Sequence, residues 1–149
     1  MEMTVSLPGG ARVDATYKDF VIRTDQPARH GGDDTAPAPF DYFLASIGTC
    51  AGYYAQRFLE QRGLATDGVV LTLETVKDSR THMIDNIKIR IRLPESFPRK
   101  YQRAIVHAVD LCTVKRHLET PPSFETIVEI EPTPAIAVAT GPQHREEKS

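Results

Sequence analysis

The chain has 149 residues, 40% of them hydrophobic, and its 18 Lys and Arg residues nearly balance its 20 Asp and Glu residues. This length and composition suit one domain with its own core, and the near-neutral charge argues against a dedicated nucleic-acid-binding protein, which would carry a basic patch. No apolar run approaches the ~20 residues that cross a bilayer, and the first residues lack the basic and apolar segments of a secretory signal. We therefore expect a cytoplasmic protein with no nucleic-acid or membrane partner.

Residues 1–24 have the pattern of three short strands. Residues 3–7 alternate between apolar and polar side chains and end at the turn-forming sequence Pro8-Gly9-Gly10. Residues 13–17 and 20–24 are two further runs, so the pattern predicts a small antiparallel meander. Residues 25–38 are rich in Pro, Gly and Asp and have no periodicity. They indicate a loop, and loops of this length are usually functional or disordered.

Residues 39–62 have a clear helical period. Apolar side chains recur every three or four residues, Pro39 suits the first helical turn, and Gly63 suits the helix end. The N-terminal half of this helix is apolar on nearly every side, which is more than one small sheet can cover. We therefore expect the helix, which contains Cys50, to bury a second face in a partner subunit.

The second half of the chain predicts two strands, two helices and a final strand. Residues 69–75 and 87–93 alternate as strands. The second strand has a basic face, formed by Lys88, Arg90 and Arg92, which is most simply solvated. Residues 99–111 and 114–118 have helical patterns, Thr113 is placed to cap the shorter helix, and residues 124–131 predict the last strand. A short apolar stretch follows at 135–138. The order predicts an α+β fold with one domain over residues 1–140 and a disordered tail over 141–149.

The two cysteines, Cys50 and Cys112, are the residues most able to carry chemistry. In a reducing compartment a lasting structural disulfide is uncommon, which leaves inert, metal-bound and redox-cycling thiols as alternatives. Zinc sites use four ligands with short local spacings, whereas these cysteines are far apart, form no CxxC, and are accompanied only by scattered histidines. We therefore expect no metal and no cofactor.

Two segments resemble the signatures of the OsmC/Ohr family of osmotically inducible and organic hydroperoxide resistance proteins. The sequence PFDYFLASIGTC at residues 39–50 is similar to P-[YE]-E-L-L-L-A-A-L-G-A-C, and CTVKRHL at residues 112–118 is similar to C-P-V-H-R-x-L. The similarity in element order covers nearly the whole chain. It implies an intertwined homodimer in which antiparallel sheets enclose long central helices that carry the first cysteine, with active sites at the subunit interface.

The resemblance also implies a thiol peroxidase that reduces organic hydroperoxides, with hydrogen peroxide as a second candidate substrate. In this chain Cys50 would be the peroxidatic cysteine, which becomes a sulfenic acid. Cys112 would be the resolving cysteine, which condenses with that sulfenic acid to a disulfide. A lipoyl-type or low-molecular-weight dithiol would then restore both thiols.

In the family an arginine stabilises the thiolate, and a glutamate near the start of the helix orients that arginine. Arg29, in the long loop before the helix, is the first candidate, and Arg23 and Arg12 on the N-terminal strands are the others. At the glutamate position this chain has Phe40, which cannot orient an arginine. Asp41, the next residue, lies about 100° around the helix. It is either the substitute carboxylate or a favourable charge in the first helical turn.

The second segment departs from the signature at Thr113, which replaces proline, and at Lys115, which replaces histidine. Thr113 can still cap the following helix. Lys115 either helps to hold Cys112 as a thiolate or is a solvated lysine.

There are two alternatives to a peroxidase, and the first uses an apolar pocket that we expect at the interface. In one, the pocket holds a lipid-like or aromatic ligand and the cysteines only pack. In the other, the cysteine pair serves a redox sensor or a sulfur-transfer protein. The missing glutamate favours these alternatives, whereas the presence of both cysteines favours the peroxidase and the redox sensor. The predicted pocket residues are Phe40, Phe43, Tyr54 and Tyr101.

Overall fold

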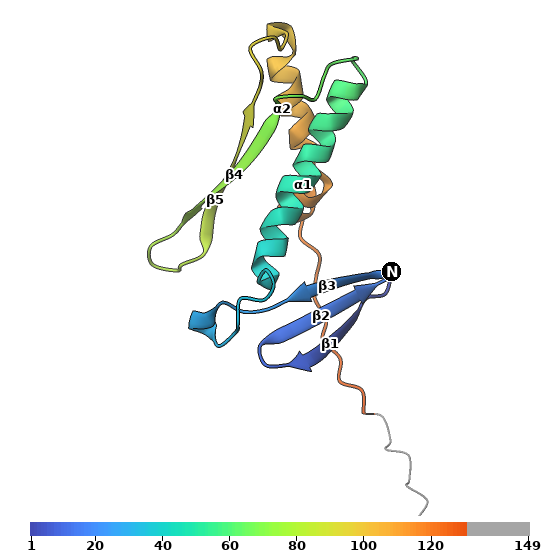
Figure 1. Cartoon of the computed structure of the whole chain (residues 1–149), viewed down its shortest axis with the longest axis vertical. Helices are drawn as coiled ribbons and strands as arrows, with labels where there is room; N and C mark the ends of the chain where they lie inside the picture. The colour runs from blue at the N-terminus through green and yellow to red at the C-terminus, as the bar shows by residue number, and fades with distance from the viewer. Residues whose placement is uncertain (131–149) are drawn as a thin grey trace, which may run out of the picture.

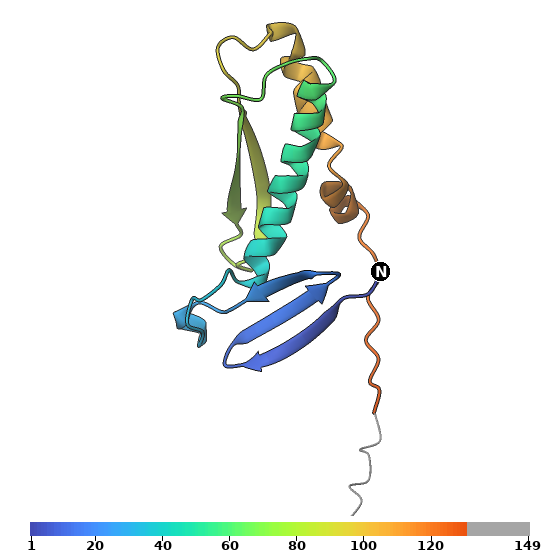
Figure 2. The same cartoon turned by 45° about the vertical axis from the view of Figure 1, so that its right-hand side comes forward.

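The computed structural model describes residues 1–130, which form two small antiparallel sheets and three α-helices. Figure 1 shows the first sheet at the N-terminal end of the long helix α1 (Pro39–Glu60) and the second sheet running beside that helix. Turning the molecule in Figure 2 places α1 between the second sheet and the two C-terminal helices. The predicted α+β class is confirmed.

The predicted N-terminal meander is present. Strands β1 (Thr4–Gly9), β2 (Arg12–Tyr17) and β3 (Phe20–Thr24) pair in that order, antiparallel throughout. Gly9 and Gly10 both have positive φ, at 110° and 63°, which only glycine adopts without strain in the turn between β1 and β2. Every residue of β1 is exposed, so this sheet contributes little to the core of a single chain.

Helix α1 confirms the predicted helix. Pro39 occupies its first turn, where the missing N–H costs nothing. At the other end Gly63 has a φ of 61°, and the N–H of Leu64 donates to the carbonyl of Leu59, which closes the helix. One side of the helix is buried, along Ile47, Ala51, Ala55, Phe58 and Leu59.

The core lies between α1, the second sheet and α2. Strands β4 (Val70–Lys77) and β5 (Ile84–Arg92) pair antiparallel. A 3₁₀ turn, η2 (Arg99–Tyr101), precedes α2 (Gln102–Asp110), and α3 (Thr113–Glu119) follows. On the outer face of the sheet Arg90 Nε lies 2.6 Å from Glu74 Oε1, and both side chains are exposed, as expected of a solvated face. The buried core residues include Ala51, Ala55, Phe58, Leu59, Phe97, Ile105 and Val109.

The predicted strand at 124–131 is wrong for the part that the structure describes. Residues 121–130 form no strand, and Figure 2 shows them as a coil leaving α3. Phe124 and Ile130 are 92% and 91% exposed. A strand needs a second strand to take its backbone hydrogen bonds, and residues 1–120 place none beside this segment. The stretch 135–138, the boundary at residue 140 and the tail 141–149 lie outside the described residues.

Between residues 1 and 130 no helix combines the length and the apolar composition that a membrane span requires.

Candidate active site

The two cysteines meet where α3 begins. Cys50 lies in the middle of α1, and Cys112 directly precedes α3, which packs on α1. Both are free thiols, and they lie close enough for each to shift the pKa of the other. Cys112 is 0% exposed, whereas Cys50 is half-buried. The structure therefore brings together the two residues that sequence reasoning selected, and Cys50 is the more accessible of the two.

The surroundings of Cys50 favour its thiolate. Burial alone would raise its pKa, but three donors outweigh burial and lower it: the backbone N–H of Val114, the thiol of Cys112 and the backbone N–H of Thr113. A hydrogen bond to the charged form of a group stabilises that form. Cys50 is thus the more readily ionised thiol of the pair.

Cys112 behaves in the opposite way. Burial raises its pKa, and the nearby Cys50 raises it further, against the smaller lowering effect of the Lys115 and Val114 N–H groups. Its thiol also lies 4.0 Å from the carbonyl oxygen of Ile47, to which it can donate. Cys112 therefore ionises less readily than Cys50, because two adjacent thiolates would repel each other.

The prediction that Thr113 caps α3 is wrong. Cys112 occupies the N-cap position, Thr113 is the first helical residue, and no side chain caps this end. The Thr113 hydroxyl instead lies 2.8 Å from the hydroxyl of Tyr54, one turn after Cys50 on α1. Sequence reasoning missed this pair because the two residues are 59 positions apart.

Lys115 forms an ion pair within the chain, and neither of its two alternatives is decided by that contact. Its ammonium group lies 2.7 Å from Asp110 Oδ1, and this partner raises the pKa of the lysine. The pKa of Cys112 is raised rather than lowered. Lys115 acts on the site through its backbone N–H.

Arg29 lies on a tightly organised loop. The residue is exposed, in the 3₁₀ turn η1 (Ala28–His30). The loop closes around Asp25, 1% exposed, whose carboxylate accepts the N–H groups of Gln26, Asp33 and Thr35 and the Thr35 hydroxyl. These bonds lower the pKa of Asp25 to about 2.

Within residues 1–130, no hydrogen bond or ion pair joins Arg29, Arg23 or Arg12 to either cysteine. Arg12 Nε contacts the Gly9 carbonyl at 3.5 Å, and the Arg23 carbonyl accepts the Tyr42 hydroxyl. Sequence reasoning also missed Asp25. The sequence feature that could have identified it is its position as the first residue of a Gly- and Asp-rich loop, because aspartate side chains often accept hydrogen bonds from nearby backbone N–H groups in turns.

For Asp41 the structure favours the helix-terminus alternative. Its Oδ2 accepts the backbone N–H of Ala38 at 2.9 Å, where it closes the start of α1. Phe40 is 53% exposed, and its ring packs on Phe43 with centroids 5.2 Å apart. Neither residue contacts an arginine in the described part of the chain.

The four predicted pocket aromatics do not line one cavity within a chain. Phe40 and Phe43 lie at the start of α1, whereas Tyr101 packs edge-on against Phe58 near its end. Tyr54 lines a cleft of about 560 Å³ between α1 and α2, which Leu111 also borders. Neither cysteine lines this cleft, although Tyr54 lies one helical turn after Cys50 and Leu111 directly precedes Cys112.

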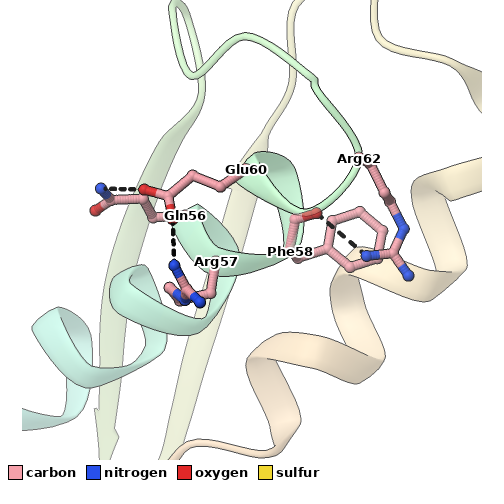
Figure 3. A network of polar contacts seen from close by, with 5 residues as sticks. All are labelled: Gln56, Arg57, Phe58, Glu60 and Arg62. Atoms are coloured by element: carbon pink, nitrogen blue, oxygen red, sulfur yellow. Dashed lines mark hydrogen bonds and ion pairs between the residues drawn. The ribbon is translucent and has the colours of Figure 1, made fainter.

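The cleft also contains two arginines, Arg57 and Arg62, and both are engaged within the chain. Figure 3 shows Arg57 directed at Glu60, with Nη1 2.8 Å from the carboxylate, and Arg62 stacked on the Phe58 ring. They hold the C-terminal end of α1 rather than reaching toward Cys50. The described residues contain no group of three or more potential ligands that could hold a metal ion.

Comparison with known proteins gives a family and a fold. The family model described as OsmC-like protein matches residues 31–127. No curated protein matches the chain. Among solved structures, an osmotic stress induced and detoxification response protein from Psychrobacter arcticus 273-4 is similar with a TM-score of 0.65 and 19% identity, over 76% of this chain and 85% of that one.

Two further structures agree. An OsmC like protein from Mycoplasma pneumoniae has a TM-score of 0.63 and 12% identity, over 79% of this chain and 86% of that one. The organic hydroperoxide resistance protein OhrB of Bacillus subtilis has a TM-score of 0.51 and 17% identity, over 80% and 90%. At these identities the likeness establishes the shared fold.

Proposed function

The chain belongs to the OsmC-like protein family, and from this premise we propose that it is a thiol-dependent peroxidase that reduces organic hydroperoxides. Cys50 is the peroxidatic residue and Cys112 the resolving residue. A structural neighbour that is named for organic hydroperoxide resistance supports the substrate class.

The observation that carries the proposal is a pair of neighbouring thiols that differ in burial and whose pKa values are shifted in opposite directions. The thiolate, not the thiol, attacks a peroxide, and Cys50 has the lowered pKa and is the more accessible residue. Cys112 has the raised pKa and the buried sulfur. A buried thiol with a raised pKa, beside a more readily ionised thiol, is suited to react with the sulfenic acid once it has formed rather than with the peroxide.

The chemistry balances with these two residues and a dithiol. The Cys50 thiolate attacks one oxygen of the hydroperoxide, the O–O bond breaks, and the alkoxide leaves and takes a proton to become the alcohol. Cys50 is then a sulfenic acid. The Cys112 sulfur attacks the Cys50 sulfur, water leaves, and a disulfide forms. A lipoyl-type or other small dithiol reduces the disulfide by exchange and becomes oxidised itself.

We further propose that the active protein is a homodimer. Sheet β1–β3 and residues 124–130 expose many large apolar side chains, more than a lone subunit ordinarily leaves in water. Because a peroxidatic thiolate needs a cation nearby, Arg29 of a second copy is the candidate for that role.

The cleft between α1 and α2 supports an organic rather than a small inorganic substrate. Tyr54, Phe58 and Leu111 line it, together with polar residues such as Arg57, and ligand pockets are mainly apolar with a few polar groups. A cytoplasmic location fits two thiols that must return to the reduced state.

The experiment is a hydroperoxide-consumption assay with purified full-length protein, cumene hydroperoxide and dihydrolipoamide. Turnover that is lost in Cys50→Ser and that requires the dithiol supports the proposal. Equal consumption by wild type and Cys50→Ser would overturn it and leave the ligand-binding alternative.

A further inference from the structure

The hydrogen bond between Tyr54 and Thr113 joins the two segments that carry the cysteines. Tyr54 lies four residues after Cys50, on the same face of α1. Thr113 directly follows Cys112. The two hydroxyls are 2.8 Å apart, so this bond fixes the start of α3 on α1 beside the Cys50 sulfur.

Thr113 contacts the site through two separate groups. Its hydroxyl bonds Tyr54, and its backbone N–H, like that of Val114, lies close enough to Cys50 to lower the pKa of that thiol. As the first residue of α3 it has no carbonyl within the helix to receive that N–H. A proline, which occupies this place in the signature that residues 112–118 resemble, has neither group.

We propose that Tyr54 and Thr113 are positioning residues, which hold the Thr113 and Val114 N–H groups against the Cys50 sulfur. Together they replace part of the thiolate stabilisation that a carboxylate-oriented arginine would supply in a chain with Phe40. The inference rests on the proposed peroxidase function but concerns the reactivity of Cys50 itself.

Other titratable groups lie near the two sulfurs and must be considered with them. Cys112 faces Cys50 directly, and Lys115 with its partner Asp110 flanks Cys112. Substitutions at Tyr54 and Thr113 leave all three in place. A change in the ionisation of Cys50 in those variants therefore reports on the donated N–H groups.

The backbone permits the decisive substitution, Thr113→Pro. Proline is favoured at the first helical position, and Cys112 before it has φ −48° and ψ 122°, outside the helical region that a following proline disfavours. Thr113→Val removes only the hydroxyl, Thr113→Ser keeps both groups, and Tyr54→Phe removes the partner hydroxyl.

The test is the pH dependence of Cys50 alkylation by iodoacetamide in the full-length reduced protein, followed by peptide mass spectrometry from about pH 5 to about pH 10. Thr113→Pro should raise the pKa of Cys50 by roughly one unit, which is about a tenfold loss of thiolate below that pKa. Thr113→Val and Tyr54→Phe should each raise it by about half as much. Their combination should raise it no further, because both break the same bond.

Thr113→Ser keeps the hydroxyl and the N–H group, so its alkylation profile should match that of the wild type. A wild-type profile in Thr113→Pro would overturn the role of the Thr113 N–H group. A wild-type profile in Tyr54→Phe would overturn the role of the hydrogen bond between Tyr54 and Thr113. Alkylation consumes no peroxide, so these outcomes are distinct from a failure of the hydroperoxide assay.

Discussion

The side chain of Cys112 lies beside that of Cys50, and this proximity lowers the pKa of Cys50 and raises the pKa of Cys112. The half-buried Cys50 is therefore the more readily ionised thiol, and the fully buried Cys112 is the less readily ionised one. In the proposed cycle, the same proximity would serve both the attack on the peroxide and the later formation of the disulfide.

The first prediction is the order of ionisation. In alkylation of the reduced wild-type protein, the half-maximal rate for Cys50 should come at a lower pH than that for Cys112, because backbone N–H groups and the Cys112 thiol lower the pKa of Cys50, whereas burial raises the pKa of Cys112. Cys112 should react slowly in the folded state at any pH, since it is fully buried. Peptide-resolved mass spectrometry measures both profiles in one sample, and the reverse order would contradict the assignment of roles.

The second prediction separates the resolving role from the peroxidatic role. Cys112→Ser should accumulate a sulfenic acid on Cys50 after one equivalent of cumene hydroperoxide, because no thiol is present to condense with it. Dimedone labelling should therefore be strong in Cys112→Ser and weak in wild type. Cys50→Ser is the matched control, and dimedone labelling of Cys112 in that variant would show that the roles are exchanged.

The third prediction concerns Asp41. Because its carboxylate closes the start of α1, Asp41→Asn should lower the Tm by roughly 2–4 °C, the usual effect of weakening a helix start in a protein of this size. The rate of Cys50 oxidation should change little. Phe40→Glu should raise that rate if an arginine from a second copy is within reach, and Arg29→Ala should remove the gain. A large loss of oxidation rate in Asp41→Asn, with Tm unchanged, would instead make Asp41 the arginine-orienting carboxylate.

The fourth prediction concerns the loop that carries Arg29. The pKa of Asp25 is lowered from 3.8 to about 2, so its ionised form stabilises the fold above pH 3.8, and this contribution is lost as the pH falls through about 2. The difference in Tm between wild type and Asp25→Asn should therefore be constant from neutral pH to about pH 4 and shrink below it. Asp33→Asn is the control, because Asp33 joins the network through its backbone N–H. A difference that does not change with pH would show that the charge of Asp25 has no part in it.

The fifth prediction concerns the homodimer and residues 124–130. In an extended segment Phe124, Val128 and Ile130 share one face, and Ile127 lies on the other. Val128→Asp should raise the dimer dissociation constant at least about tenfold if that apolar face is buried by a second copy. Ile127→Asp adds the same charge on the opposite face and should have a smaller effect in sedimentation equilibrium. A wild-type protein that sediments as a folded monomer at micromolar concentration would contradict the dimer itself.

Much of the fold followed from local pattern. Strong alternation at residues 87–93 and a helical period from Pro39 onward placed β5 and α1 correctly, and the two signature-like segments selected cysteines that the fold brings together. The strand at 124–131 was predicted from the same alternation and is absent, because pairing depends on a second strand that residues 1–120 do not place there.

The finer parts of the site depend on contacts between distant residues. Thr113 has the sequence context of a helix cap, but Tyr54 takes its hydroxyl, and no local rule identifies a partner 59 residues away. The sequence left two roles open for Asp41, because a carboxylate in the first helical turn can stabilise the helix start or orient a neighbouring arginine. The hydrogen bond from the Ala38 N–H favours the first role. The arginine could not be chosen because its proposed partner lies on another copy of the chain.

The most direct measurement of the central claim is an intact-mass titration of fully reduced wild-type protein with cumene hydroperoxide. Each chain should consume one equivalent of peroxide and lose the mass of two hydrogens, and peptide mapping should find Cys50 joined to Cys112. Cys112→Ser should gain one oxygen instead, and Cys50→Ser should stay unchanged. A wild-type protein that keeps its reduced mass after excess peroxide, while its fold is intact, would contradict a thiol peroxidase.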